Sequence, residues 1–183
     1  MYKINEFDSK LALDEQFSAQ VAKILAEAIA VNGKASIAVS GGNTPKGFFA
    51  ALSKADIAWE KVTITLADER WVEQTSDASN TQLVKQNLLQ NNAAKATFFE
   101  LKVDGDLTQP TLLALSAAAE AQILPFDVLV LGMGEDGHTA SLFPCCNELA
   151  DALDTSNKQV LLKTVPTSAP HQRITFSYAA LLE

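Results

Sequence analysis

The sequence predicts an α/β fold: one domain over residues 1–183, built on a doubly wound, mostly parallel sheet with helices on both faces. Short apolar runs alternate along the chain with longer segments whose apolar residues recur every three or four positions, the order of strand and helix in such folds. The run at 126–131 is rich in valine and leucine, as in a strand buried on both faces. A length of 183 residues with 48% hydrophobic content suits a single sizeable core.

The first predicted helix runs from a cap at Asp8 or Ser9 to about Val31. Its apolar residues recur at helical spacing, and the pair at 32–33, Asn-Gly, is a typical helix stop. A short buried strand follows at 35–39. These two elements are expected to pack on each other and to carry no chemistry themselves.

The remaining elements alternate in the same way. Ser79 and Gln82 have the spacing of a capping box, which places a helix start there. The predicted elements, in order, are a strand within 59–67, a helix from 79 to about 90 or 91, a strand at 96–101, a helix at 110–123, the strand at 126–131, a short helical turn at 139–142, strands at 160–165 and 173–178, and a helix from 179.

Composition excludes several classes of partner. The net charge of −8 disfavours nucleic acid and anionic membrane surfaces, which attract clustered lysine and arginine. No apolar run approaches the roughly 18 residues of a membrane helix, and the first residues lack the apolar core of a signal peptide. Cys145 and Cys146 are adjacent, which fits neither a disulfide framework nor a metal site, so we expect packing roles and a cytoplasmic location.

A polar glycine loop follows the strand at 35–39. It consists of Ser40, Gly41, Gly42, Asn43 and Thr44. Thr44 suits a helix N-cap and Pro45 the first helical position, so the loop opens a helix. Free backbone N–H groups and the helix dipole favour a phosphate there, although an ordinary tight turn remains the alternative. The spacing to Lys46 is not that of a Walker loop.

Three charged residues and a tryptophan follow the strand within 59–67. If that strand is parallel to the preceding one, Arg70 emerges at the edge that carries the glycine loop, where a guanidinium can hold a phosphate or a developing oxyanion. The alternative is an exposed turn in which Glu69 and Arg70 face solvent and Trp71 packs on the sheet. Asn80 is interpreted as a turn residue, with a side chain that points at the pocket as the alternative.

The strand at 126–131 ends in a second glycine segment that leads to His138. The glycines at 132, 134 and 137 match a dinucleotide fingerprint, but Glu135 and Asp136 would repel a pyrophosphate. A carboxylate beside His138 can instead orient the imidazole and raise its basicity, which makes it a general base; a structural histidine is the alternative. His171 lies in a proline-rich segment and is expected to be exposed, and neither histidine has partners at metal-ligand spacing.

Several motifs together carry a family resemblance. They are SGGNTP at 40–45, LADERWV at 66–72, SNTQLVKQNLL at 79–89, LGMGEDGHTASLFP at 131–144 and RITFSYAALL at 173–182. In this order and spacing the chain resembles the 6-phosphogluconolactonase family. The resemblance implies the fold shared with glucosamine-6-phosphate deaminases and ribose-5-phosphate isomerases. It also implies hydrolysis of 6-phospho-D-glucono-1,5-lactone in the oxidative pentose phosphate pathway, with no metal or organic cofactor.

The resemblance also implies roles for single residues. His138 corresponds to the catalytic base, Arg70 to an arginine that assists charge and proton movement, and Arg173 to an arginine near the phosphate. The loop at 40–44 corresponds to the phosphate loop. Asp136 is expected to support His138, and the backbone around Gly134 to contact the substrate.

Two alternatives remain open. A deaminase or isomerase of the same fold would need a carboxylate base, for which Asp68 is a candidate, but Ser-Leu-Phe-Pro at 141–144 replaces the Asn-Glu-Pro ending expected in deaminases. A sugar-phosphate sensing module without turnover is the other. Family members usually continue with a helix, a strand and a segment bearing glycine and lysine, which we expect this domain to lack after Glu183. We expect a monomer or a weak homo-oligomer.

Overall fold

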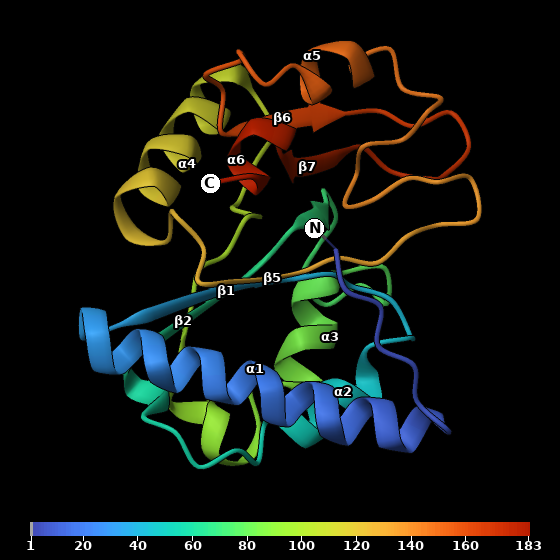
Figure 1. Ribbon diagram of the computed structural model, residues 1–183. Coiled ribbons are helices and arrows are strands. Elements are labelled where there is room, and N and C mark those ends of the chain that lie inside the picture. The colour runs from blue at the N-terminus through green and yellow to red at the C-terminus, as the bar shows by residue number, and fades with distance from the viewer. Residues whose placement is uncertain (1) are drawn as a thin grey trace.

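A four-stranded parallel sheet forms the centre of the computed structural model, which describes residues 2–183 (Figure 1). Its order is β4-β2-β1-β5, with β1 at Ala35–Val39, β2 at Val62–Leu66, β4 at Thr97–Phe98 and β5 at Val128–Val130. Val39 is in register with Leu66 on one side and Val130 on the other, so three strands end at the same edge. The predicted α/β class and mostly parallel sheet are confirmed.

A second, antiparallel sheet was not predicted. It has the order β3-β7-β6, with β3 at Asp68–Arg70, β7 at Arg173–Phe176 and β6 at Leu161–Thr164. The exposed turn that was the alternative for Glu69 and Arg70 is not what the structure has, because the chain continues from β2 into this sheet. Ala67 is the junction, because its N–H donates to Val39 O at 2.8 Å and its carbonyl accepts from Phe176 N at 3.1 Å.

Helices cover one face of the parallel sheet, and the second sheet with α4 lies on the other (Figure 1). The helices are α1 Lys10–Asn32, α2 Lys46–Leu52, α3 Asn80–Asn87, α4 Gln109–Gln122, α5 Leu149–Leu153 and α6 Tyr178–Leu181, with 3-10 helices at Trp59–Lys61 and Asn91–Lys95. The expected covering of both faces is thus present, but an antiparallel sheet supplies much of one layer. Among residues 2–183 no helix combines the length and apolarity that crossing a membrane requires.

Local capping signals fix most helix ends. Ser9 accepts from Ala12 N at 3.1 Å at the start of α1, and Gly33 ends it with a φ of 76°, a conformation that glycine adopts without strain. Ser79 likewise accepts from Gln82 N at 3.2 Å. The expected cap of α2 is wrong, because the helix begins at Lys46 with Pro45 as N-cap and no side-chain capping bond. Thr44 is therefore left available to the loop.

Three other segments differ from expectation. The strand at 96–101 is only two residues long, since Phe99 follows with a single bond to Ile64 O. Residues 139–142 form a tight turn closed by a bridge between Thr139 and Leu142, not a helical turn. The short helix α5 was not predicted, because five residues carry too little periodicity to be recognised.

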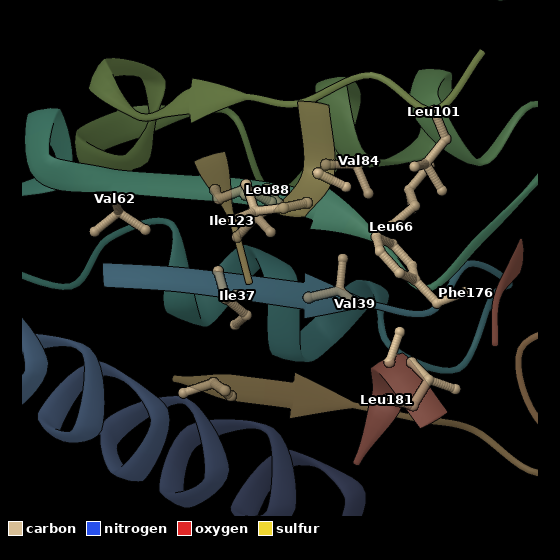
Figure 2. Close-up of a cluster of buried hydrophobic side chains, with 14 of the residues drawn as sticks. Ile37, Val39, Val62, Leu66, Val84, Leu88, Leu101, Ile123, Phe176 and Leu181 are labelled. Carbon is tan, nitrogen blue, oxygen red and sulfur yellow. The ribbon is translucent and has the colours of Figure 1, made fainter. Parts of the chain in front are cut away.

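The apolar core lies between the layers. Ile37, Val39 and Leu66 on the central strands are fully buried (Figure 2). Phe176 of β7 and Leu181 of α6 lie beside Val39 and Leu66, so the second sheet shares the core of the first. Phe176 also meets Phe126 edge to face, with ring centroids 5.1 Å apart.

Phe176→Ala should therefore loosen the joint between the two sheets. Loss of a fully buried phenyl ring should lower the free energy of unfolding by about 3–5 kcal/mol. Urea denaturation followed by circular dichroism measures this, with Leu113→Ala on the exposed side of α4 as the control. Equal stability of the two variants would show that the sheets do not share a core.

Candidate active site

A cavity of about 620 Å³ opens where β1 and β5 end, beside the second sheet. Most of the residues proposed from the sequence line it: Ser40, Gly41, Gly42, Thr44, Arg70, Gly134, His138 and Arg173. Asn43 is exposed outside the lining, and Asp136 reaches the cavity only through His138. Segments far apart in the sequence are thus brought to one place.

The glycine loop forms one wall. The Ser40 hydroxyl donates to Val130 O and accepts from Gly132 N, both at 3.2 Å, so it ties the ends of β1 and β5 together. Across residues 2–183, no acceptor is recorded for the backbone N–H groups of the loop at 41–44. Gly41 packs tightly on α3, because a Cβ there would lie 1.9 Å from Asn80 Oδ1 and would displace that side chain. The loop therefore presents free donors held against α3.

Two buried residues, Asn80 and Glu69, connect the cavity to the start of α3. Asn80 lines the cavity, and its side chain donates to Asp68 O at 3.2 Å, so it is not a simple turn residue. Glu69 is fully buried rather than exposed in a turn. Its carboxylate accepts from Asn80 N at 2.8 Å and Thr81 N at 2.6 Å, at the start of α3, where a negative charge is favoured.

Glu69 also fixes the neighbouring groups. It accepts from Arg70 N at 2.7 Å and from the Ser79 hydroxyl at 3.2 Å. One buried carboxylate thus joins β3 to α3 and sets the directions in which Arg70 and Asn80 leave the backbone.

Two arginines stand directly opposite each other. Arg70 of β3 is in register with Arg173 of β7, and side chains at such positions lie on the same face of an antiparallel pair. Both line the cavity, and each has a buried Nε without a partner within residues 2–183. Burial, and then the charge of Arg70, lower the pKa of Arg173. Two positive charges at opposed positions repel each other, and an anion bound between them would relieve that repulsion. The pair therefore suits a site for an anion.

One amino group of each guanidinium donates a hydrogen bond to a backbone carbonyl. Arg70 Nη1 donates to Ala78 O at 2.7 Å, and Arg173 Nη2 donates to Pro170 O at 3.3 Å. Asp68 lies 3.9 Å from Arg173 Nη1 and also accepts from the Ser141 hydroxyl. This carboxylate offsets part of the positive charge and is already engaged.

His138 and Asp136 are joined by hydrogen bonds beside the cavity. His138 Nδ1 lies 2.5 Å from Asp136 Oδ1, and the same oxygen accepts from His138 N at 3.2 Å. The hydrogen bond with His138 lowers the pKa of Asp136, which keeps the carboxylate ionised. Gly137 has a φ of 83°, so the turn that carries the pair needs a glycine there. Because Asp136 engages Nδ1, the other ring nitrogen of His138, Nε2, is the one that can exchange a proton with a ligand or water.

The N-terminal helix contributes a side of the cavity that the sequence analysis missed. Leu13, Asp14 and Phe17 of α1 line it. Asp14 is buried, pairs with Lys10 at 2.6 Å, and occupies the space that a Cβ at Gly47 would fill. The sequence did contain a signal for this role. Asp14 stands three residues before Phe17, at a position where the helical spacing expects an apolar side chain.

The arrangement can bind an anion and move a proton. Donors from the glycine loop and the two arginines converge on a cavity whose other side carries a carboxylate-supported histidine. Over residues 2–183 no three His, Cys, Asp or Glu side chains form a possible metal cluster, and His171 is exposed. The groups that remain suit attack of water on an activated carbonyl of an anionic substrate.

Comparison with known proteins gives concordant matches. A sequence model described as "Glucosamine-6-phosphate isomerases/6-phosphogluconolactonase" matches residues 8–183. The 6-phosphogluconolactonase of Rhizobium meliloti is 42% identical over 175 residues, which are 96% of this chain and 75% of the relative. That of Mesorhizobium japonicum is 43% identical over 182 residues, or 100% of this chain and 76% of the relative.

Solved structures agree. A crystal structure of a 6-phosphogluconolactonase from Shewanella baltica has a TM-score of 0.92 at 48% identity, and the match covers 96% of this chain and 75% of that one. The 6-phosphogluconolactonase of Trypanosoma brucei has a TM-score of 0.80 at 25% identity, covering 100% and 78% of the two chains. The chain spans about three quarters of the length of these relatives.

Glu69→Gln tests the role of the buried carboxylate. An amide group would turn a donor toward backbone N–H groups, so the free energy of unfolding should fall by about 1–3 kcal/mol. Chemical denaturation measures the change, and Glu60→Gln at an exposed position is the matched control. An unchanged stability would mean that Glu69 does not anchor α3.

Proposed function

The chain belongs to the family of glucosamine-6-phosphate isomerases and 6-phosphogluconolactonases, and we propose that it hydrolyses 6-phospho-D-glucono-1,5-lactone to 6-phosphogluconate in the oxidative pentose phosphate pathway. The observation that carries this is one cavity shared by the His138–Asp136 pair and the opposed arginines. Relatives named 6-phosphogluconolactonase at 42% and 43% identity support the same reaction.

The phosphate is assigned to the glycine loop and Arg173. Free N–H groups of residues 41–44 and a buried guanidinium together offer directional, charge-assisted donors. Burial strengthens such bonds, since little water competes for the donors. The phosphate would hold the end of the sugar that does not react and so orient the lactone carbonyl.

His138 is assigned as the general base. Its Nε2 takes a proton from water as the water oxygen attacks C1 of the lactone, and Asp136 stabilises the imidazolium that forms. Arg70, or N–H groups of the segment around Gly134, stabilise the tetrahedral oxyanion. Collapse of that intermediate breaks the bond between C1 and the ring oxygen, which leaves as the C5 hydroxyl after taking the proton from His138. A lactone is a reactive ester, so no covalent nucleophile is required.

The deaminase or isomerase alternative has weaker support. It needs a carboxylate free to move a proton between C1 and C2, and Asp68 lines the cavity. However, Asp68 accepts a hydrogen bond from the Ser141 hydroxyl and lies beside Arg173, so its carboxylate is already engaged in contacts within the protein. Assays with glucosamine 6-phosphate separate these activities. Binding of 6-phosphogluconate with neither reaction would indicate a sensing module.

Two further proposals concern the setting of the enzyme. We place it in the cytoplasm, where phosphorylated sugars are metabolised, and as a monomer or weak homo-oligomer. Light scattering across a range of protein concentrations tests the second proposal, and a tight dimer at the lowest concentration would contradict it.

His138→Gln should remove most of the activity. Loss of a positioned base should lower kcat about 10²- to 10⁴-fold with little change in KM. The lactone is generated in situ and its disappearance is followed with and without enzyme. The control is His171→Gln, which removes the other histidine and should leave kcat unchanged. A His138→Gln enzyme with wild-type kcat would exclude the base assignment.

Asp136→Asn should lower kcat about tenfold or more, because an amide can neither stabilise the imidazolium nor fix its tautomer. The hydrogen bond with His138 lowers the pKa of Asp136, so the carboxylate is ionised at pH 6 as well as at pH 8 and the loss should be present at both. Initial rates at the two pH values measure this. A loss confined to one of them would show that the carboxylate acts in another way.

A further inference from the structure

Phe143 contacts both functional halves of the cavity. Its ring stacks on the imidazole of His138, with centroids 4.0 Å apart and an interplanar angle of 19°. The guanidinium carbon of Arg173 lies 5.4 Å from the centre of the same ring. Phe143 is 5% exposed and lines the cavity. A single aromatic side chain therefore lies against both the base and an anion-binding arginine.

Asp136 and Gly134 also restrain His138, but they leave the plane of its imidazole ring free to rotate. Asp136 holds Nδ1, but the Asp136 side chain is 44% exposed, so this bond forms at the surface. Gly134 confines the ring edge, since a Cβ there would lie 2.3 Å from Cε1 and Nδ1. Neither contact fixes the plane of the ring. The stacking with Phe143 supplies that restraint.

Phe143 itself is held from the second sheet. Two residues earlier, Ser141 N donates to the Thr175 hydroxyl at 3.3 Å, and Ser141 O accepts from the Thr164 hydroxyl at 3.1 Å. The Ser141 hydroxyl donates to Asp68. These bonds attach the turn to β3, β6 and β7, and β3 and β7 carry the two arginines. The base is thereby positioned relative to the sheet that binds the anion.

We propose that Phe143 is a positioning residue that fixes the plane of the His138 imidazole and couples it to Arg173. This rests on the proposed lactonase function, because the role is to aim Nε2 at the water beside a bound substrate.

Phe143→Leu is the kinetic test. The expected effect is a three- to tenfold fall in kcat with KM changed less than twofold, and recovery of kcat in Phe143→Tyr. In a His138→Gln background the same substitution should have no further effect, since no base remains to be positioned. Phe126→Leu, which removes an aromatic pair outside the cavity, is the matched control and should keep kcat.

Proton NMR tests the geometry without activity. The protein has only two histidines, and His171→Gln assigns their ring signals. Ring current from Phe143 should shift the His138 ring protons upfield, and Phe143→Leu should remove that shift. If Phe143→Leu does not fold, Phe143→Met conserves more of the packing and should show the same two losses.

The outcomes separate the two proposals. Wild-type protein that does not hydrolyse the lactone contradicts the proposed function, while the NMR shift still reports the stack. Unchanged kcat in Phe143→Leu, an equal loss in Phe126→Leu, or a further loss in the His138→Gln background would overturn the positioning role. A His138 signal that does not move in Phe143→Leu would overturn the stacking itself.

Discussion

The site depends on the hydrogen bonds that the buried carboxylate of Glu69 accepts. It accepts hydrogen bonds from Arg70 N, Asn80 N and Thr81 N, and so joins the second sheet to the start of α3. Asn80 then packs against Gly41 so closely that a Cβ at position 41 would displace the Asn80 side chain. One fully desolvated group therefore places the glycine loop relative to the arginine wall, the side of the cavity formed by Arg70 and Arg173. Glu69 must keep its partners because an unpaired buried carboxylate is costly.

Electrostatics explain how a chain of net charge −8 can hold a phosphorylated substrate. Arg70 and Arg173 are concentrated at opposed positions of two strands, and Asp68 offsets only part of their charge. The low dielectric of a partly buried wall strengthens their attraction for an anion, while the acidic remainder of the surface is screened by salt. The local positive charge of the two arginines thus outweighs the negative net charge of the chain at the cavity.

The sequence was most informative where the signal is local. Gly41 and Gly42 after an apolar strand, and His138 two residues after Asp136, could be recognised because strand end, turn and functional group are adjacent in the chain. The edge at which parallel strands end brings such segments together in any fold of this class. The capping residues Ser9 and Ser79 were recognised for the same reason.

Features that depend on long-range pairing were missed. β3 consists of three charged residues and is a strand only because β7, about a hundred positions later, pairs with it. The position of Asp14 at the cavity and the stacking of Phe143 on His138 likewise arise from contacts between separate elements. Thr44 failed as a cap because Pro45 adopts a helical conformation with no side-chain bond.

The most direct test of the account compares two substrates, 6-phosphogluconolactone and the same lactone without its phosphate. If the arginine wall and glycine loop bind the phosphate while His138 acts at the carbonyl, remote binding energy should raise kcat/KM for the phosphorylated lactone by at least about 100-fold. Equal kcat/KM values for the two lactones would contradict the account, because the cavity would then not recognise a phosphate.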